Sequence, residues 1–170
     1  MKKSLLALFL TFSMLTGIFT NVYAQDEVDQ DFESFLEKFT SSTEFQYSRI
    51  KFPITTPIVL LGDNGEEIEV PFTADEWPLL EAKDFIEGRH ESDEGILFGR
   101  YTKKEDDQVM FETGLEESEL DLIITFDKVD GKWYVTDCYN GWYGSLYASD
   151  FDATVYEVQQ RNTDFAEKNP

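Results

Sequence analysis

The most constraining feature of this sequence is a pair of β-prone segments joined by an Asp-Gly turn. Residues 120–142 read LDLIITFDKVDGKWYVTDCYNGW, with β-branched and aromatic residues on both sides of Asp130-Gly131. An Asp-Gly pair between two such runs is a strong local signal for an antiparallel β-hairpin. We therefore expect a central ribbon here, which the other elements cover or extend.

Two loop lengths are compatible with this hairpin, and they place Asp137 on different faces of the sheet. With Asp130-Gly131 alone as the loop, Ile124 lies opposite Asp137, and the carboxylate faces the apolar side. A buried carboxylate there could act as a general acid or base. With a three-residue loop that starts at Val129, the pairing shifts by one residue. Asp137 then lies on the opposite face with Trp133, Val135 and Tyr139, while Tyr134, Thr136 and Cys138 join the apolar face.

The three-residue loop separates polar from apolar side chains more cleanly, and we favour it. Asp137 is then a structural, hydrogen-bonded residue of the strand. Cys138 is the single cysteine of the chain, which excludes an intramolecular disulfide. Its position within a β-prone run favours a buried, inert thiol over a reactive one.

The first 24 residues have the pattern of a secretory signal peptide. Lys2 and Lys3 precede an apolar stretch, and Val22-Tyr23-Ala24 supplies a cleavage site. A membrane anchor needs about 20 predominantly apolar residues, and this stretch is shorter and interrupted. We expect cleavage before Gln25, with no stable membrane insertion afterwards. Residues 25–30 are predicted to be a flexible tether, and residues 31–170 a single α+β domain.

The charge of the chain excludes one class of partner. Asp and Glu number 35 and Lys and Arg 14, which gives a formal net charge of −21. Such a chain repels nucleic acid. The remaining candidates are a small-molecule, glycan or protein partner.

Hydrophobic periodicity predicts helices at both ends of the domain. Phe32, Phe35, Leu36 and Phe39 fall on one helical stripe. A short second helix follows, with Phe45 and Tyr47. Further elements are an edge or bent strand over 50–54, a hairpin of 58–61 and 67–70, a short helix near 77–80, a charged loop over 86–95, strands over 96–102 and 109–115, and a C-terminal helix from about 151 to 165 capped by Ser149. The expected fold class is α+β, with N-terminal helices packed on a curved antiparallel sheet and a C-terminal helix.

This order of elements resembles the cone-shaped domains of the nuclear transport factor 2-like (cystatin-like) superfamily. Residues 31–53, DFESFLEKFTSSTEFQYSRIKFP, followed by Trp77 and by GKWYVTDCYNGW, resemble a narrower group. This group is the secreted domain-of-unknown-function family numbered 4348, found in gut-dwelling Gram-negative bacteria. The resemblance implies a cone fold and a location in the periplasm, at the cell surface or outside the cell. It carries over no catalytic residues.

Four residues are candidates for ligand binding. Arg49 could pair with a ligand anion, although an intramolecular ion pair is the alternative. Whether Asp137 can reach a ligand depends on the hairpin register, which decides the face of the sheet on which it lies. Tyr139 and Trp142 could form an aromatic stacking surface, or Trp142 could cap the core. His90 is the single histidine, within a charged segment, and no metal or cofactor motif is present.

These observations support two functions. The first is a non-catalytic ligand-binding or protein-interaction domain of an exported protein. The alternative is a small cone-fold enzyme, of the isomerase, dehydratase or hydrolase type, that uses a pocket carboxylate. The exposed sheet faces of such cones also allow a dimer.

Overall fold

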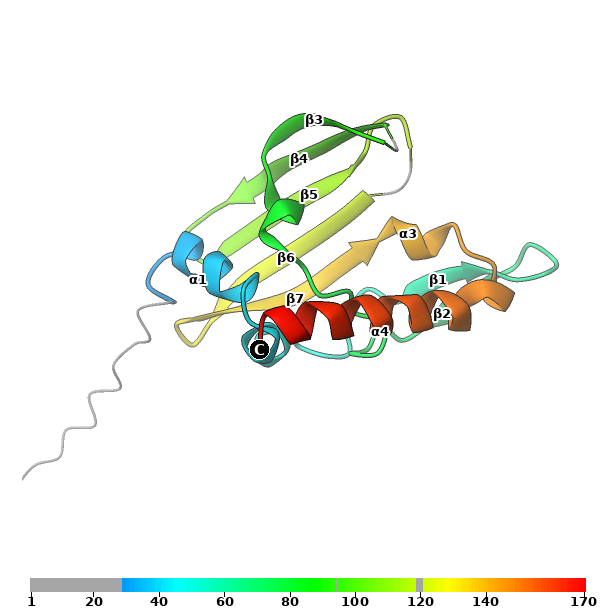
Figure 1. Cartoon of the computed structure of the whole chain (residues 1–170), viewed down its shortest axis with the longest axis horizontal. Coiled ribbons are helices and arrows are strands. Elements are labelled where there is room, and N and C mark those ends of the chain that lie inside the picture. Colours follow the sequence, from blue (N-terminus) through cyan, green and yellow to red (C-terminus); the bar gives the residue numbers. More distant parts are fainter. Residues whose placement is uncertain (1–28, 94, 119–120) are drawn as a thin grey trace, which may run out of the picture.

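A computed structural model describes residues 29–93, 95–118 and 121–170. The predicted signal peptide, residues 1–24, lies outside these ranges. The described part contains a five-stranded antiparallel sheet of strand order β3-β4-β5-β6-β7, a separate β1–β2 hairpin, and helices (Figure 1). The predicted α+β class and C-terminal helix are confirmed. The elements are α1 (Phe32–Phe39), α2 (Thr43–Ser48), β1 (Ile58–Leu61), β2 (Glu67–Val70), η2 (Ala82–Phe85), β3 (Gly88–Ser92), β4 (Gly95–Lys104), β5 (Gln108–Leu115), β6 (Asp121–Val129), β7 (Lys132–Asn140), α3 (Gly141–Gly144), η3 (Ala148–Asp150) and α4 (Phe151–Lys168).

The β6–β7 hairpin has the two-residue loop, so the three-residue loop that we favoured is wrong. Val129 pairs with Lys132, and Asp130 and Gly131 have φ values of 52° and 80°. Two successive positive φ values are the type I′ geometry, whose twist matches that of the flanking strands. The local chemistry of the turn therefore decides the pairing next to it.

A β-bulge in β7 then changes the pairing further along the hairpin. Thr125 pairs with Asp137, whereas the next residue of β6 pairs with Val135, so Thr136 is the extra residue of the bulge. An extra residue shifts the alternation of faces by one. Cys138 consequently points into the core, where it is 1% exposed, and Asp137 lies on the opposite face. The position of Asp137 thus follows from the bulge.

Aromatic side chains fill the end of the sheet that lies under α1. Phe32, Phe35 and Phe39 are buried at the predicted helical spacing. The ring centroid of Phe32 lies 5.1 Å from that of Phe126 and 5.3 Å from that of Trp133. Trp133 is therefore a core residue, as is Val135, although the favoured register placed both beside Asp137.

A buried glutamine of α2 holds the segment that precedes η2. Gln46 is fully buried, and its Nε2 donates to the carbonyl oxygens of Phe39 and Leu80 at 2.8 and 3.0 Å. Its Oε1 accepts from Trp77 Nε1 at 3.1 Å and from the backbone N of Leu80 at 2.8 Å. All donor and acceptor positions of the carboxamide are used. Residues 77–80 are thereby fixed against α2.

Residues 77–80 do not form the short helix that the sequence predicted. Thr73 and Glu76 make a hydrogen bond of the kind that starts a helix, from the Thr73 backbone N to Glu76 Oε2 at 2.8 Å. However, Pro78 disfavours a helical backbone at Trp77. The backbone N and O of Leu80 then pair with Gln46 instead of with a helical turn.

Two further segments differ from the predictions. Residues 50–54 form an isolated bridge between Ile50 and Val135 in place of a strand, and the Phe52–Pro53 peptide bond is cis. The segment predicted as a charged loop over 86–95 contains β3, which pairs with β4. Polar side chains on both faces are typical of such an edge strand.

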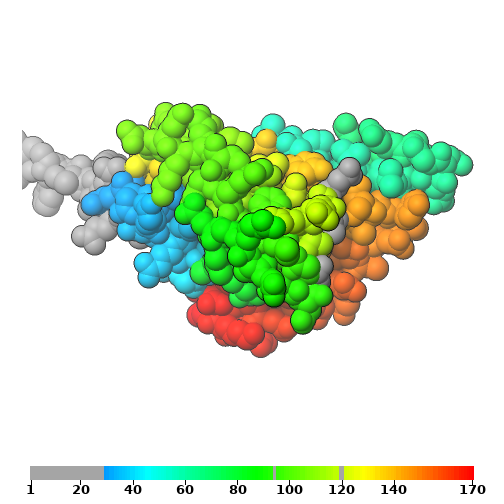
Figure 2. Space-filling model, turned by 90° about the horizontal axis from the view of Figure 1, so that it is seen from above, coloured from blue at the N-terminus to red at the C-terminus, as the bar shows by residue number. Residues whose placement is uncertain are grey.

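Helix α4 returns the chain to α2. The backbone N and Oγ1 of Thr43 donate to the carbonyl oxygen of Asn169 at 2.9 and 2.8 Å. The N-cap of α4 is Asp150, not the predicted Ser149. Figure 2 shows the β1–β2 hairpin and the N-terminal helices at opposite ends of the molecule. Within the described ranges, no helix is long and apolar enough to cross a bilayer.

Candidate functional site

A pocket of about 580 Å³ lies toward the other end of the sheet. Its floor consists of two groups of residues, each of which strand pairing aligns. His90 of β3 pairs with Leu97 of β4, and Thr113 of β5 pairs with Leu122 of β6, which also pairs with Asn140 of β7. Residues directly opposite each other in antiparallel strands share a face. Five strands therefore contribute to one cavity.

Apolar side chains from the flanking segments form the walls. Leu80 comes from the segment that Gln46 holds, and Val158 and Phe165 come from α4. Leu146 follows α3 and also lines the pocket. Such a mainly apolar lining with a few polar groups is typical of small-molecule sites.

A partly buried pair of hydrogen bonds fixes two walls relative to each other. Asn162 of α4 accepts from the backbone N of Leu79 at 2.8 Å through its Oδ1. Its Nδ2 donates to the carbonyl oxygen of Trp77 at 2.7 Å. Helix α4 and the 77–80 segment are thus joined directly, and the pocket between them is preformed.

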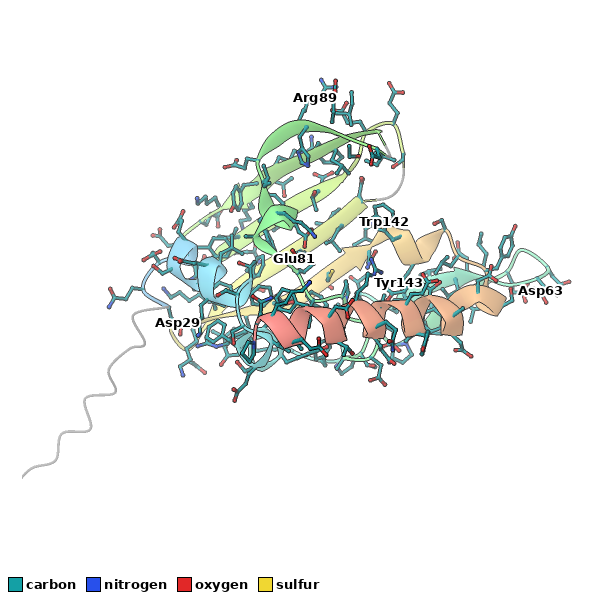
Figure 3. The ribbon with its side chains drawn as sticks, viewed as in Figure 1. Asp29, Asp63, Glu81, Arg89, Trp142 and Tyr143 are labelled. Atoms are coloured by element: carbon teal, nitrogen blue, oxygen red, sulfur yellow. The ribbon has the colours of Figure 1, made fainter. Side chains whose placement is uncertain are left out.

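Helix α3 places two aromatic residues at the end of the sheet (Figure 3). Asn140 Oδ1 accepts from the backbone N of Trp142 at 3.1 Å and so begins the helix. Trp142 is 42% exposed and lines the pocket. Tyr143 is buried, and its hydroxyl donates to the carbonyl oxygen of Glu76 at 2.6 Å. Burial raises the pKa of Tyr143. Tyr143 therefore caps the core, and Trp142 stays accessible.

The pocket lining includes a carboxyl group beside η2. The backbone N of Glu81 donates to Asp84 Oδ2 at 2.7 Å. Burial raises the pKa of Asp84 above its ordinary value of 3.8. The Glu81 carboxylate lies 3.2 Å from Lys83 Nζ. Asp84 is thus a carboxyl group of the lining whose pKa the fold raises.

Two nitrogen-bearing side chains of the lining have unused hydrogen-bonding capacity. His90 Nδ1 is buried and has no hydrogen-bond partner among the described residues. Arg161 of α4 is exposed, and within the described ranges it forms no ion pair. These groups are the open polar positions of the pocket.

Arg49, a predicted ligand-binding residue, lies away from the pocket, near the N-terminal end of the described chain. Its Nη1 and Nη2 contact Asp29 Oδ1 and Oδ2 at 2.8 and 2.9 Å, and Nη1 also donates to the carbonyl oxygen of Trp133. Both charged side chains are buried, so the guanidinium is engaged within the protein. Asp29, predicted as part of a flexible tether, is instead fixed by this pair (Figure 3).

Asp137 and Tyr139 lie on the face of β7 opposite the pocket. Asp137 Oδ1 accepts from the backbone N of Thr56 at 2.9 Å, and Oδ2 accepts from Thr56 Oγ1 at 3.0 Å. Tyr139 is 46% exposed and does not line the pocket. Of the four predicted residues, the structure therefore brings Trp142 alone to the cavity among the described residues.

Sequence reasoning missed the other polar residues of the pocket. His90 was assigned to a solvated loop because its neighbours are charged, and Asp84 and Arg161 carry no motif. Their proximity depends on β3 pairing with β4 and on α4 packing across the sheet. No group of three or more His, Cys, Asp or Glu that could hold a metal occurs in the described part of the chain.

Comparison with known proteins places the chain in a family. A family model described as "-like:-like" matches residues 30–166. A comparison with curated proteins finds no match.

Three solved structures are similar over most of their length. The crystal structure of a cystatin-like protein from Bacteroides caccae has 50% identity and a TM-score of 0.78, and the match covers 83% of this chain and 96% of that one. A protein from Bacteroides uniformis has 47% identity and a TM-score of 0.76, with 83% and 97% covered. A protein from Bacteroides ovatus has 47% identity and a TM-score of 0.73, with 86% and 97% covered. The chain therefore belongs to the family of these cystatin-like Bacteroides proteins.

Proposed function

We propose that this protein is an exported cell-envelope protein that binds a small, largely apolar molecule without catalysis. The observation that carries the proposal is the pocket of about 580 Å³ between the sheet and α4. Small-molecule sites usually have volumes of roughly 300–1,000 Å³ and apolar linings with few polar groups. The size and lining of this cavity match that class.

The fixed walls support binding in a preformed site. Gln46 and Asn162 hold the 77–80 segment, and Asn140 positions α3. A preformed pocket loses little conformational entropy when a ligand enters. Trp142 adds an exposed aromatic face, which contributes contact area with few torsions to freeze.

Export is the second part of the proposal, with mature-chain cleavage before Gln25 and a location in the periplasm or at the cell surface. The N-terminal sequence pattern supports it, as does the resemblance to the exported family numbered 4348. Mass spectrometry of the protein recovered from cell-envelope and culture fractions tests this part. An N-terminus at Gln25 is expected, whereas an uncleaved cytoplasmic chain would contradict export.

Binding can be tested with 1-decanol as a neutral apolar probe. Trp77 and Trp133 are buried, so a change in fluorescence on binding should come mainly from Trp142. Trp142→Ala should weaken decanol binding measured by calorimetry. Tyr139→Ala is the matched control, since Tyr139 is similarly exposed but lies outside the pocket. Absence of saturable decanol binding to the unmodified protein would refute the proposal.

A second candidate function is a cone-fold enzyme of the isomerase, dehydratase or hydrolase type, with Asp84 as the pocket carboxyl. It is favoured by the raised pKa of Asp84, which burial causes, because a carboxyl with a raised pKa is better suited to act as a general acid near neutral pH. Carbonyl-carbon NMR titration measures this pKa directly. A value at or below 3.8 would remove the candidate.

A further inference from the structure

We infer that the ligand of this pocket is amphipathic and carries a carboxylate, which Arg161 binds while the apolar body lies against Trp142 and the leucine side chains of the lining. This inference rests on the proposed binding function and specifies its chemical class of ligand. It follows from the polar groups of the pocket and from which of them already have partners.

Most polar side chains of the lining are engaged within the protein. Those with a hydrogen bond or ion pair are Thr113 (to the Phe98 carbonyl), Asn140 (from the Trp142 backbone N), Asn162 (with Leu79 and Trp77), Tyr143 (to the Glu76 carbonyl), Thr154 (to the Asp150 carbonyl), and Asp84, Glu81 and Lys83 among themselves. The Asp84 carboxylate thus already accepts a backbone hydrogen bond, and the Glu81 carboxylate is already paired with Lys83.

The remaining capacity belongs to Arg161 and His90. Arg161 makes no ion pair within the described ranges, and its guanidinium can only donate hydrogen bonds. The planar guanidinium matches a carboxylate in a bidentate geometry, which is stronger than a neutral hydrogen bond. His90 Nδ1, buried at the floor, is a second unpaired nitrogen. Because Lys83 is paired with Glu81, Arg161 is the lining cation without an ion-pair partner within the described ranges, and the ligand group complementary to it is an anionic acceptor.

The position of Arg161 separates the charged group from the apolar body. Arg161 is exposed on α4, whereas Leu80, Leu122 and Val158 are buried in the lining. A ligand that fits both has its carboxylate at the mouth and its apolar part inside. The guanidinium can keep much of its hydration in this arrangement, so binding does not require burial of an ion pair.

Decanoate, 1-decanol and decylammonium test the charge requirement with one chain length. Their dissociation constants are measured by calorimetry at pH 7.5 and physiological salt for the unmodified protein, Arg161→Gln and Lys168→Gln. Lys168 is the matched control, because it is a cation of the same helix that does not line the pocket. N-acetylphenylalanine and its amide form a second pair, which distinguishes a peptide-like carboxylate from an aliphatic one.

We expect an acid to bind about tenfold or more tightly than its neutral counterpart, as for one charge-assisted hydrogen bond. Arg161→Gln should abolish this preference, while Lys168→Gln retains it. Equal binding of acid and neutral probes, a preference that survives Arg161→Gln, or tighter binding of decylammonium would overturn the inference and leave the binding function intact. Failure of every probe to bind would overturn both.

Discussion

Replacing Gln46 with methionine tests how the segment over the pocket is held in place. Gln46 is fully buried, and its carboxamide is the partner of Trp77 Nε1 and of both backbone polar groups of Leu80. Methionine has a similar length but offers no comparable donor or acceptor. The substitution therefore leaves three polar groups of the 77–80 segment without their partner, with little change in side-chain volume.

The expected loss of stability follows from the number of groups left unpaired. A buried polar group without a partner costs about 1–3 kcal/mol, so these three groups and the carbonyl oxygen of Phe39, which also loses its bond to Gln46, give roughly 4–12 kcal/mol. Relaxation of the segment toward the adjacent pocket would let water reach some of them, and we expect a loss of about 3–5 kcal/mol. This is a large part of the 5–15 kcal/mol or so that stabilises a typical domain.

Urea unfolding followed by circular dichroism measures this loss. At an m-value of about 2 kcal/mol per molar, the midpoint should fall by at least about 1.5 M. Decanol binding should weaken as well, since Leu80 forms part of the pocket wall. Gln160→Met on the exposed face of α4 is the control, with an expected change within about 0.5 kcal/mol. A loss below about 1 kcal/mol for Gln46→Met would refute the argument.

Three other substitutions or treatments test the core and the site. Asp29→Asn leaves Arg49 buried without its counter-charge and should cost about 3–5 kcal/mol in urea unfolding. The control is Glu33→Gln, at the partly exposed Glu33–Lys104 pair, which should cost less than about 1 kcal/mol. Equal effects of the two substitutions would contradict a structural role for the buried Asp29–Arg49 pair. For Asp84, the folded pKa is raised above 3.8, so the protonated form stabilises the fold at low pH, and that stability is lost as the pH rises through the folded pKa. Asp84→Asn should therefore raise the melting temperature at pH 7 relative to the unmodified protein and change it less at pH 3, whereas a lower melting temperature at pH 7 would show that the ionised carboxylate is stabilising. Burial raises the pKa of the Cys138 thiol, so Ellman's reagent at pH 8 should react slowly with the folded protein and rapidly in urea; fast stoichiometric labelling without urea would place Cys138 at the surface.

The turn of the central hairpin could be predicted from the sequence, but the register beyond it could not. Asp130-Gly131 specifies a two-residue loop through its own backbone preferences. The bulge is held within the hairpin by Thr136 Oγ1, which donates to Asp127 of β6, and from outside it by Thr56, which donates to Asp137. An argument from the polarity of β6 and β7 alone therefore selected the wrong register.

The helices were predictable where an apolar stripe coincides with a suitable cap. In α1, Asp31 accepts from the backbone N of Ser34 at 2.7 Å, and the phenylalanine stripe packs on the sheet. The 77–80 segment has the same local signals, but Pro78 and the distant Gln46 override them. In β3 the local signals fail in the opposite direction. Its charged composition predicts a loop, but its pairing with β4 makes it a strand.

The pocket depends on the sizes of the core-face side chains on three neighbouring strands, which no single segment shows. On the core face, β6 changes from Phe126 near α1 to Leu122 at the pocket, and β7 changes from Trp133 to Asn140. In β5, Val109 lies opposite Phe126, and the polar Thr113 at the pocket follows the larger Phe111. Strand pairing places these changes side by side across the sheet.

At the end under α1, the large rings fill the space beneath the helix, because close-packed interiors leave few voids larger than a water molecule. At the other end, the smaller side chains cannot fill the distance to α4, which Asn162 fixes through its bonds to the 77–80 segment. A cavity must then remain between them. The same hydrogen bonds that stabilise this end of the fold therefore also prevent its collapse, which is why we assign the pocket to function and the aromatic end to stability.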